Sequence, residues 1–476
     1  METFNNIIST FDGWVWGIPL IVVILATGVY LTCRTGLLQV RQLPRALKFI
    51  VKKEDLGDGK VGDVSSFASL CTALSATIGT GNIVGVATAI TAGGPGALFW
   101  MLIAAFFGMA TKYAEGLLAV KYRIKDHEGK MLGGPFYYIE RGMGSRWKWL
   151  AKLFAVFGAG AGLLGIGTIT QVHGITSAVG NFFDPEKSFC LHILGQDISI
   201  YVVIAGLIIT LAVALVVIGG IKRISGVASV VVPFMAIIYV VFCLVVICCN
   251  ITAIPHAVAE IVAGAFNPGA VTGGLVGSFF IAMQSGIARG IFSNESGLGS
   301  APIASAAAQT REPVRQGLVS MTGTFIDTIV ICTMTGLTIV LTGAWQVPSL
   351  KGVAVTTYAF QNGLFFLPPQ VPAFILMICL VFFAFTTILG WDYYGEKCLE
   401  YLTNQNKPAV IGYRIAYILA VLIGPYLTVE AVWNIADIFN GLMAFPNLIA
   451  LLALGGVVAK ETKDYLRRMK EDPRLR

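Results

Sequence analysis

Long stretches of apolar residues, separated by short polar segments, run through the whole chain of 476 residues. Most stretches hold about 20 residues, the length that an α-helix needs to cross a hydrocarbon core of about 30 Å. This pattern predicts an all-α polytopic membrane protein with eleven transmembrane helices. The predicted spans are Trp14–Thr32, Val64–Ile90, Ala97–Val120, Leu150–Val172, Ile198–Ile218, Val227–Cys249, Gly274–Ile291, Leu318–Leu341, Val371–Leu389, Val410–Leu427 and Ile435–Val458.

The basic residues predict the orientation of these spans. If the N-terminus lies outside, 31 of the 33 Lys and Arg residues fall on the inner side, and only Lys187 and Lys351 fall outside. Basic residues collect on the cytoplasmic side of membrane proteins. We therefore predict an outer N-terminus and an inner C-terminus in the cell membrane. The net charge of +7 then indicates contact with anionic membrane lipid rather than with nucleic acid.

The composition excludes several classes of protein. Hydrophobic residues make up 56% of the chain and charged residues 12%, against about 25% charged in soluble domains, so a soluble enzyme or a secreted disulfide scaffold is excluded. The chain contains no GxxxxGK[ST] phosphate-binding loop and no HExxH zinc motif. We expect no cofactor and no enzymatic activity, and an ion gradient rather than ATP as the energy source.

Two of the predicted spans carry residues that interrupt a helix. The second contains Ala76–Asn82 and the seventh contains Gln284–Gly290, and both place glycine with hydroxyl or amide side chains near mid-membrane. Freed backbone groups are tolerated there only where they line a cavity within the protein. The two spans are five apart, so the blocks that they open have opposite orientations, as in secondary transporters with inverted repeats. The predicted divisions are an accessory helix and loop (1–63), two inverted five-helix repeats (64–250 and 251–459) and a basic tail (460–476).

The predicted break at Gly79–Asn82 has a definite chemistry. The free N–H groups at one half-helix end attract a carboxylate, and the free C=O groups at the other attract Na⁺ or an ammonium group. The side-chain oxygen of Asn82 is a further ligand for a hard cation. The alternative is close helix packing through small residues.

Asp327, Thr386 and Thr387 are further polar residues inside predicted spans. A carboxylate within the membrane is usually functional, so Asp327 is a candidate cation ligand or proton carrier. The alternative for Asp327 is a carboxylate that neighbouring helix ends satisfy. The alternative for the two threonines is a hydrogen bond to the carbonyl four residues earlier in their own helix.

Three other polar sites have simpler interpretations. Gln171 can reach a substrate from the fourth span. Lys112 and Glu115 are three residues apart in a predicted helix, and we expect them to pair with each other. Asn294-Glu295-Ser296 follows the second predicted break and is a candidate inner gate.

Two long motifs resemble those of a known family. Gly93–Met101 reads GGPGALFWM and Gly290–Pro302 reads GIFSNESGLGSAP. Both are similar to signatures of the alanine or glycine:cation symporters, the sodium:alanine symporter family. The resemblance implies a leucine-transporter-type fold with one additional N-terminal helix. It also implies uptake of a small neutral amino acid, typically alanine or glycine, driven by Na⁺ or less often by H⁺.

The resemblance also implies roles for individual residues. The substrate carboxylate would bind at the break, and the implied substrate contacts are Gly79, Thr80, Gly81, Gln171, Gln284, Ser285 and Gly286. One cation would bind near Thr77, Asn82, Asp327 and Thr328. A second cation would bind to the carbonyls of Ser75 and Ile78 and the hydroxyls of Thr386 and Thr387.

The resulting hypothesis is Na⁺-coupled symport of alanine or glycine into the cell by alternating access. The alternatives within transport are a proton-coupled carrier that uses Asp327 and a member of the same family that prefers glutamine. An ion channel that uses the breaks as a filter is a more distant alternative.

Overall fold

The structure is a computed structural model that describes residues 2–52, 61–126, 128–165, 167–186, 188–193, 196–266, 277–427 and 429–472. Two residues named in the predictions lie outside this part of the chain. They are Lys187, one of the two cations predicted on the outer side, and Gly274, the predicted start of the seventh span.

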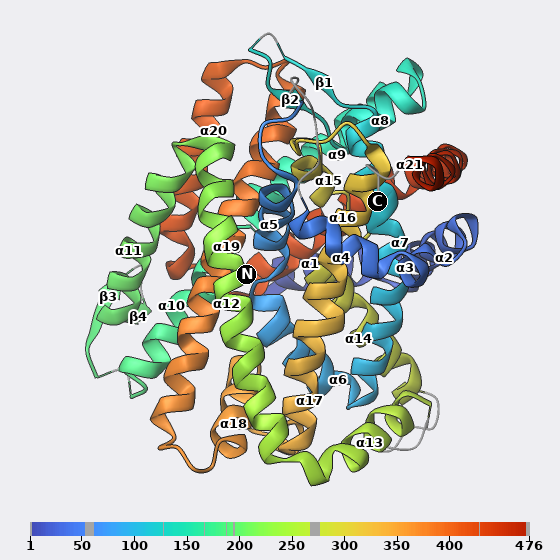
Figure 1. Ribbon diagram of the computed structural model, residues 1–476. Helices are drawn as coiled ribbons and strands as arrows, with labels where there is room; N and C mark the ends of the chain where they lie inside the picture. The colour runs from blue at the N-terminus through green and yellow to red at the C-terminus, as the bar shows by residue number, and fades with distance from the viewer. Residues whose placement is uncertain are drawn as a thin grey trace.

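The first half of the chain is mainly helical, and its predicted spans fall on helices, with further short helices between them (Figure 1). The helices are α1 (Glu2–Val15), α2 (Ile18–Thr35), α3 (Leu38–Arg41), α4 (Leu43–Val51), α5 (Ser66–Thr77), α6 (Val86–Gly93), α7 (Gly96–Lys121), α8 (Pro135–Gly142), α9 (Lys148–Leu164), α10 (Ile169–Phe183), α11 (Ile200–Val217) and α12 (Gly220–Cys249). A π-helical segment, η1 (Gly81–Gly85), leads into α6. Two antiparallel hairpins are β1 (Ile124–Lys125) with β2 (Met131–Leu132), and β3 (Cys190–Ile193) with β4 (Gln196–Ser199).

The second half is also helical. It comprises α13 (Ile254–Phe266), α14 (Gly277–Asn294), α15 (Ala301–Ser305), α16 (Pro313–Thr324), α17 (Thr333–Leu341), α18 (Val353–Gly363), α19 (Gln370–Leu402), α20 (Lys407–Ile423) and α21 (Val429–Glu471). A second π-helical segment, η4 (Phe325–Cys332), joins α16 to α17. Several of these helices begin with proline in the first turn, where its missing N–H costs nothing.

The polytopic class of the fold agrees with the prediction. In the described part of the chain, nine helices are long and apolar enough to span a membrane, and the bent pair of α5 with the helix after it makes a tenth. The seventh predicted span corresponds to α14, which directly follows undescribed residues. The count of eleven spans and their orientation therefore stay predictions.

The outermost helices carry the apolar surface that lipid requires. Figure 1 shows α11, α12 and α20 as long helices along one side of the molecule. Large apolar side chains such as Leu211 and Val230 are exposed on this side, at 64% and 70% of their surface. A contiguous apolar surface of this kind marks contact with a membrane.

The helix α7 packs at the centre, and small residues allow its close contacts. A side chain at Gly286 of α14 would meet the backbone of Ala97, and one at Gly96 would meet the backbone of Gly264. A side chain at Gly317 of α16 would meet Tyr113. Small residues at these contacts bring backbones close together, which is how helices associate without water.

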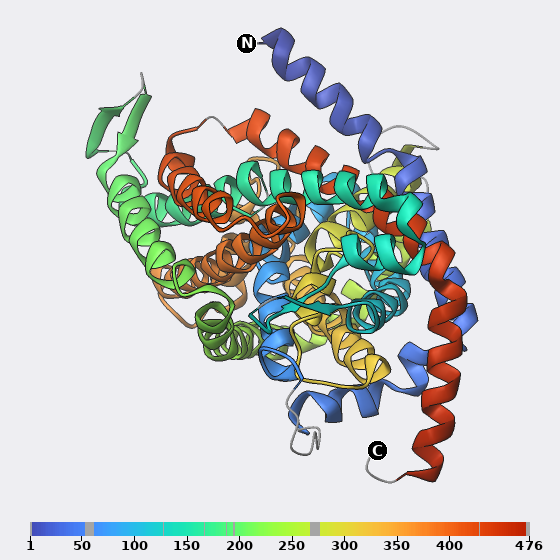
Figure 2. The ribbon, with the colours of Figure 1, turned by 90° about the horizontal axis from the view of Figure 1, so that it is seen from above.

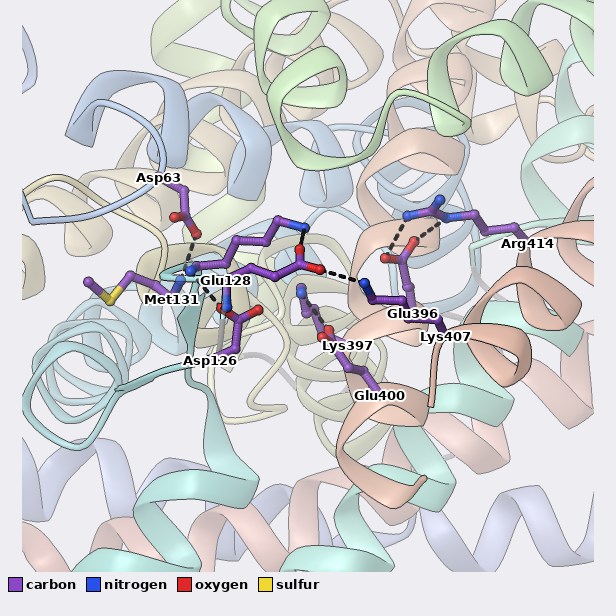
Figure 3. A network of polar contacts seen from close by, with 10 residues as sticks. Asp63, Asp126, Glu128, Met131, Glu396, Lys397, Glu400, Lys407 and Arg414 are labelled. Carbon is purple, nitrogen blue, oxygen red and sulfur yellow. Dashed lines mark hydrogen bonds and ion pairs between the residues drawn. The ribbon is translucent and has the colours of Figure 1, made fainter. Parts of the chain in front are cut away.

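A polar network ties the β1–β2 hairpin to the helical body (Figure 3). The Glu128 carboxylate accepts hydrogen bonds from Lys130 at 2.7 Å and from Lys407, at the start of α20, at 2.5 Å. Arg414 of α20 donates two hydrogen bonds to Glu396 of α19. The hairpin is therefore attached to α20 by an ion pair between segments 279 residues apart.

The charge state of this contact is stable at physiological pH. The hydrogen bonds from Lys130 and Lys407 lower the pKa of Glu128 from 4.5 to about 2. A carboxylate with a lowered pKa stabilises the folded contact above its ordinary pKa, and the effect is lost as the pH falls towards 2. The ion pair therefore persists throughout the neutral range.

Removing the lysine of this contact gives a first prediction. Lys407→Ala should speed hydrogen exchange of the amides in β1 and β2, because the hairpin loses its attachment to α20. The change should be small, since exposed ion pairs are individually weak. The control is Lys397→Ala, whose ion-pair partner Glu400 lies on the same helix. Equal exchange in wild type and Lys407→Ala would show that the ion pair does not hold the hairpin.

Candidate functional site

The predicted break in the second span is present. The helix α5 ends at Thr77, Ile78 is extended with φ −79° and ψ 94°, and the next helical segment begins at Gly81. The two segments are bent by 52° at this point. The break therefore lies where the sequence predicts it, and it frees backbone N–H and C=O groups deep in the protein.

Three side chains, one from the broken span itself and two from other helices, satisfy these freed groups. The N–H of Gly79 donates to Asn82 Oδ1 at 2.9 Å, and the N–H of Thr80 donates to Gln171 Oε1 of α10 at 3.3 Å. The hydroxyl of Thr387 on α19 donates to the Ile78 carbonyl at 3.2 Å. The break is thus a meeting point of predicted site residues.

Glycine is required at position 79 because of this crowding. A Cβ at Gly79 would lie 2.5 Å from Thr387 Oγ1 and 3.2 Å from Gln171 Oε1. Any larger residue would displace both side chains. The backbone of the break is therefore open to close approach by polar oxygen atoms.

Asn82 connects the break to Asp327 in the second half of the chain. Its amide nitrogen donates to Asp327 Oδ1 at 2.7 Å. The other oxygen, Oδ2, accepts hydrogen bonds from Ser293 at 3.0 Å and Thr328 at 2.7 Å. The carboxylate is completely buried, so its negative charge is held by polar donors from three segments.

Both sides of this connection are π-helical. Asn82 lies in η1, and Asp327 and Thr328 lie in η4. A π-helical turn widens a helix and leaves carbonyl groups unpaired, and such turns occur often at functional sites. Asn82, Asp327 and Thr328 therefore lie together, in backbone suited to coordination.

The remaining predicted cation ligands make local hydrogen bonds. Thr386 donates to the Phe383 carbonyl at 3.0 Å, Ser75 to the Thr72 carbonyl at 2.7 Å, and Thr77 to the carbonyls of the preceding turn. These are the within-helix bonds of the alternative interpretation. Thr387 also donates to the Phe383 carbonyl four residues earlier, at 3.1 Å, as the alternative interpretation expects, but of the two adjacent threonines only Thr387 contacts the break as well.

A cavity of about 310 Å³ adjoins the break. Residues of the first broken span line one side of it, among them Thr80 and Gly81. Asp437 of α21 lies on another side, and Arg289 of α14 lies 3.8 Å from it. Of the described residues that line it, Asp12, Thr80 and Asp437 each have a buried side-chain oxygen without a hydrogen-bond partner. The cavity thus offers both a hydroxyl and a carboxylate oxygen next to the break.

The predicted interruption of the seventh span at Gln284–Gly290 is wrong. The helix α14 continues through these residues to Asn294, and the chain leaves the helix at Glu295, with φ 56°. The glycines at 286 and 290 serve the alternative role of close packing, against Ala97 and Met101 of α7.

Because α14 is unbroken, several residues that were expected at a break lie elsewhere. Gln284 is exposed, Ser285 is half-buried and Gly286 packs against Ala97, and none of the three lines the cavity at the first break. Arg289, which is predicted to lie in an inner loop, lies instead within α14 and lines that cavity.

The second break lies at 295–300 and is held by carboxylates. Glu115 Oε1 of α7 accepts hydrogen bonds from the N–H groups of Gly297 at 3.1 Å and Gly299 at 3.2 Å, and from Asn447 at 2.7 Å. Glu295 accepts hydrogen bonds from Trp391 at 2.9 Å and Ser300 at 2.5 Å. Asn294-Glu295-Ser296 is therefore the start of the break itself.

The predicted pairing of Lys112 with Glu115 is wrong. In the described structure Lys112 Nζ is buried without a hydrogen-bond partner, and the Glu115 carboxylate is directed to the second break. Helical spacing alone brings residues three apart onto one face, but the freed N–H groups of Gly297 and Gly299 compete for the same oxygen. Lys112 still lies within electrostatic reach of Glu115, Glu295 and Asp327.

Sequence reasoning missed the roles of Ser293, Arg289 and Glu115. Ser293 lies inside the motif Gly290–Pro302 but has no separate signal. Arg289 and Glu115 are ionisable residues inside apolar segments, which is itself an indication of function. The sequence carries this signal for both, although it equally fits an inner loop for Arg289 and a local ion pair for Glu115.

The chain is similar to a known protein family along nearly its whole length. The model of the family described as "Sodium:alanine symporter family" matches residues 1–475. The chain is 57% identical over 469 residues to a Haemophilus influenzae protein named "Uncharacterized transporter", with 98% of this chain and 97% of that protein covered. It is 46% identical over 467 residues to the Methanococcus maripaludis protein named "Sodium/alanine symporter AgcS", with 97% of each covered.

Two further similarities are more distant. The Bacillus subtilis protein named "Probable sodium/glutamine symporter GlnT" is 36% identical over 475 residues, with 99% of this chain and 93% of that protein covered. The solved structure of MhsT in complex with L-phenylalanine superposes with a TM-score of 0.57 at 13% identity, covering 85% of this chain and 99% of that one. This likeness shows the fold alone, and it confirms the expected leucine-transporter-type architecture.

The second break generates a stability prediction. Glu115→Ala leaves the N–H groups of Gly297 and Gly299 without their acceptor, and each unsatisfied buried group costs about 1–3 kcal/mol. We expect the melting temperature of the purified protein to fall by several degrees. The control is Glu461→Ala, which removes a carboxylate paired with Lys121 at the surface. Equal melting temperatures for the two variants would show that Glu115 does not hold the break.

Proposed function

Because the chain belongs to the sodium:alanine symporter family, we propose that it is a Na⁺-coupled symporter that carries alanine or glycine into the cell. Members of this family transport amino acids together with a cation, so the protein is a multi-pass membrane transporter and not an enzyme. The observation that carries the proposal is the break after Thr77, where N–H and C=O groups are freed beside a cavity.

In this proposal the substrate carboxylate binds the N–H groups at Gly79, Thr80 and Gly81. The N–H of Thr80 is already paired with a neutral acceptor, Gln171. A carboxylate forms stronger, charge-assisted hydrogen bonds with such groups, so it displaces the amide oxygen. The Gln171 carboxamide is then available to the rest of the amino acid. Gln284, Ser285 and Gly286 have no part in this scheme.

Two cation positions complete the site. One lies near Asn82, Asp327 and Thr328, where a buried carboxylate already draws together polar donors. The other uses the Ile78 carbonyl and the Thr387 hydroxyl, which lie 3.2 Å apart. Oxygen atoms of these types are the ligands that hard cations prefer.

Ser75, Thr77 and Thr386 are secondary candidates for the same positions. Their hydroxyls are engaged within their own helices, so they contribute only if those bonds rearrange. The carbonyl of Ser75 remains a possible ligand of the second position.

Transport follows if the two repeats, 64–250 and 251–459, move against each other about the site in the cell membrane. Asn82 and Asp327 support this proposal, because their hydrogen bond joins one repeat to the other. A cation at this position neutralises Asp327 and so changes the contact between the repeats. The cation thereby couples to substrate binding, which is the requirement for symport.

The test is uptake of labelled alanine into proteoliposomes under an inward Na⁺ gradient, compared with an inward H⁺ gradient without Na⁺. We expect accumulation above equilibrium with Na⁺ only, and competition by excess glycine. Accumulation with H⁺ only would favour the proton-coupled carrier, and competition by glutamine but not glycine would favour the glutamine-preferring alternative. Non-saturating flux without accumulation would indicate a channel.

The adjacent threonines give a matched mutational test. Thr387→Val removes the hydroxyl that contacts the Ile78 carbonyl, so the Na⁺ concentration for half-maximal uptake should rise about tenfold, equivalent to ~1.4 kcal/mol. Thr386→Val changes volume and polarity equally, and both variants lose a hydrogen bond to the Phe383 carbonyl. Only Thr387→Val also loses the contact with Ile78, so the Na⁺ dependence of Thr386→Val should change less. If the two variants have the same Na⁺ dependence, Thr387 is not a ligand of the cation.

A further inference from the structure

A second cavity lies between the segment α2–α4 and the C-terminal helix α21, and shares no lining residue with the cavity at the break. It has a volume of about 1110 Å³ and is lined by the end of α2, by α3, by the start of α4 and by the last part of α21. Figure 2 shows α2 and the second half of α21 side by side along one edge of the molecule. Small-molecule sites usually have about 300–1,000 Å³, so this cavity has room for a large ligand.

The lining of this cavity is strongly basic. Seven Lys and Arg residues line it, against a single acidic residue, Asp464. They come from opposite walls, namely Arg34, Arg41 and Arg45 from the N-terminal segments, and Lys460, Lys463, Arg467 and Lys470 from α21. The carboxylate of Asp464 forms an ion pair with the guanidinium group of Arg467 at 3.6 Å. The cavity therefore fits a ligand with more than one negative charge, such as a group with two phosphates.

Apolar surface adjoins these charges on the same segments. Leu37, Val40 and Val51 are exposed at 50%, 56% and 83%, next to the arginines of α3 and α4. Leu466 and Met469 of α21 line the cavity itself. Helices that combine exposed apolar residues with basic ones lie at the boundary between headgroups and acyl chains. The ligand therefore has an apolar part as well as a charged one.

We propose that this cavity binds the headgroup of an anionic phospholipid. The phosphate groups lie between the arginines of α3–α4 and the basic residues of α21, and the acyl chains extend along the exposed apolar surface of α2. In the predicted orientation the ends of α2 and α21 both face the cytoplasm, where basic pockets between helices bind anionic headgroups. The lipid thus bridges the accessory N-terminal helix and the C-terminal helix.

The test is native mass spectrometry of the detergent-purified protein after incubation with cardiolipin, phosphatidylglycerol or phosphatidylcholine. Wild type should retain the two anionic lipids in preference to phosphatidylcholine. Two double variants, Arg41→Ala with Arg45→Ala and Lys463→Ala with Arg467→Ala, remove charge from opposite walls. Each should lower the retained anionic lipid about tenfold or more.

The matched control is Arg146→Ala with Lys152→Ala, which removes two exposed cations elsewhere and should leave lipid retention unchanged. The charge-conserving pair Arg41→Lys with Arg45→Lys should keep most of the binding, which separates loss of charge from misfolding. Equal retention by wild type and both wall variants would overturn the proposal.

A second readout separates a lipid from a free anion. Cardiolipin should raise the melting temperature of wild type and raise it less in the wall variants. An equal rise with inorganic phosphate would instead indicate a site for a soluble anion, and an equal rise with phosphatidylcholine would indicate general solvation by lipid. Both results would contradict the proposal without bearing on Na⁺-dependent uptake.

Discussion

Every backbone polar group that leaves a helix inside the membrane must find a partner within the protein. This constraint explains the arrangement around both breaks. At the first, the amide oxygens of Asn82 and Gln171 accept from Gly79 and Thr80. At the second, the Glu115 carboxylate accepts from Gly297 and Gly299. Apart from Asn82, these partners come from helices far away in the sequence, so each break determines which helices lie beside it.

The two breaks differ in the charge of the groups that hold them. The first is capped by neutral amides, which a charged ligand can replace. The second is capped by a carboxylate that is part of the protein, and charge-assisted hydrogen bonds are about twice as strong as neutral ones. The second break is therefore a fixed structural joint, whereas the first is suited to exchange of ligands. The helix α7 packs closely against Gly286 of α14 and Gly317 of α16, and this packing holds the two breaks in place.

Much of the fold followed from the sequence because lipid imposes a simple rule on length and polarity. The long apolar helices agree with most of the predicted spans, and Gly79–Asn82 lies at the first break as predicted. The prediction of a break at Gln284–Gly290 is wrong because the same sequence pattern, glycine among small polar residues, occurs where a helix is interrupted and where two helices pack closely. Lys112 and Glu115 were mispaired because local spacing says nothing about the N–H groups of Gly297 and Gly299. The π-helical turns at Asn82 and Asp327 depend on tertiary contacts and have no sequence signal of their own.

The contact between Gln171 and Thr80 has a consequence for the return half of the transport cycle that we propose. A carrier that has released its cargo must reverse its orientation without it, and a bare N–H dipole in a low-dielectric interior would oppose that step. Gln171 acts as an internal surrogate for the cargo, because its neutral oxygen pairs with the N–H of Thr80. The N–H of Thr80 is then paired in the unloaded protein as well, and the energy difference between its loaded and unloaded forms is reduced. A small difference of this kind favours rapid turnover over tight retention of the amino acid.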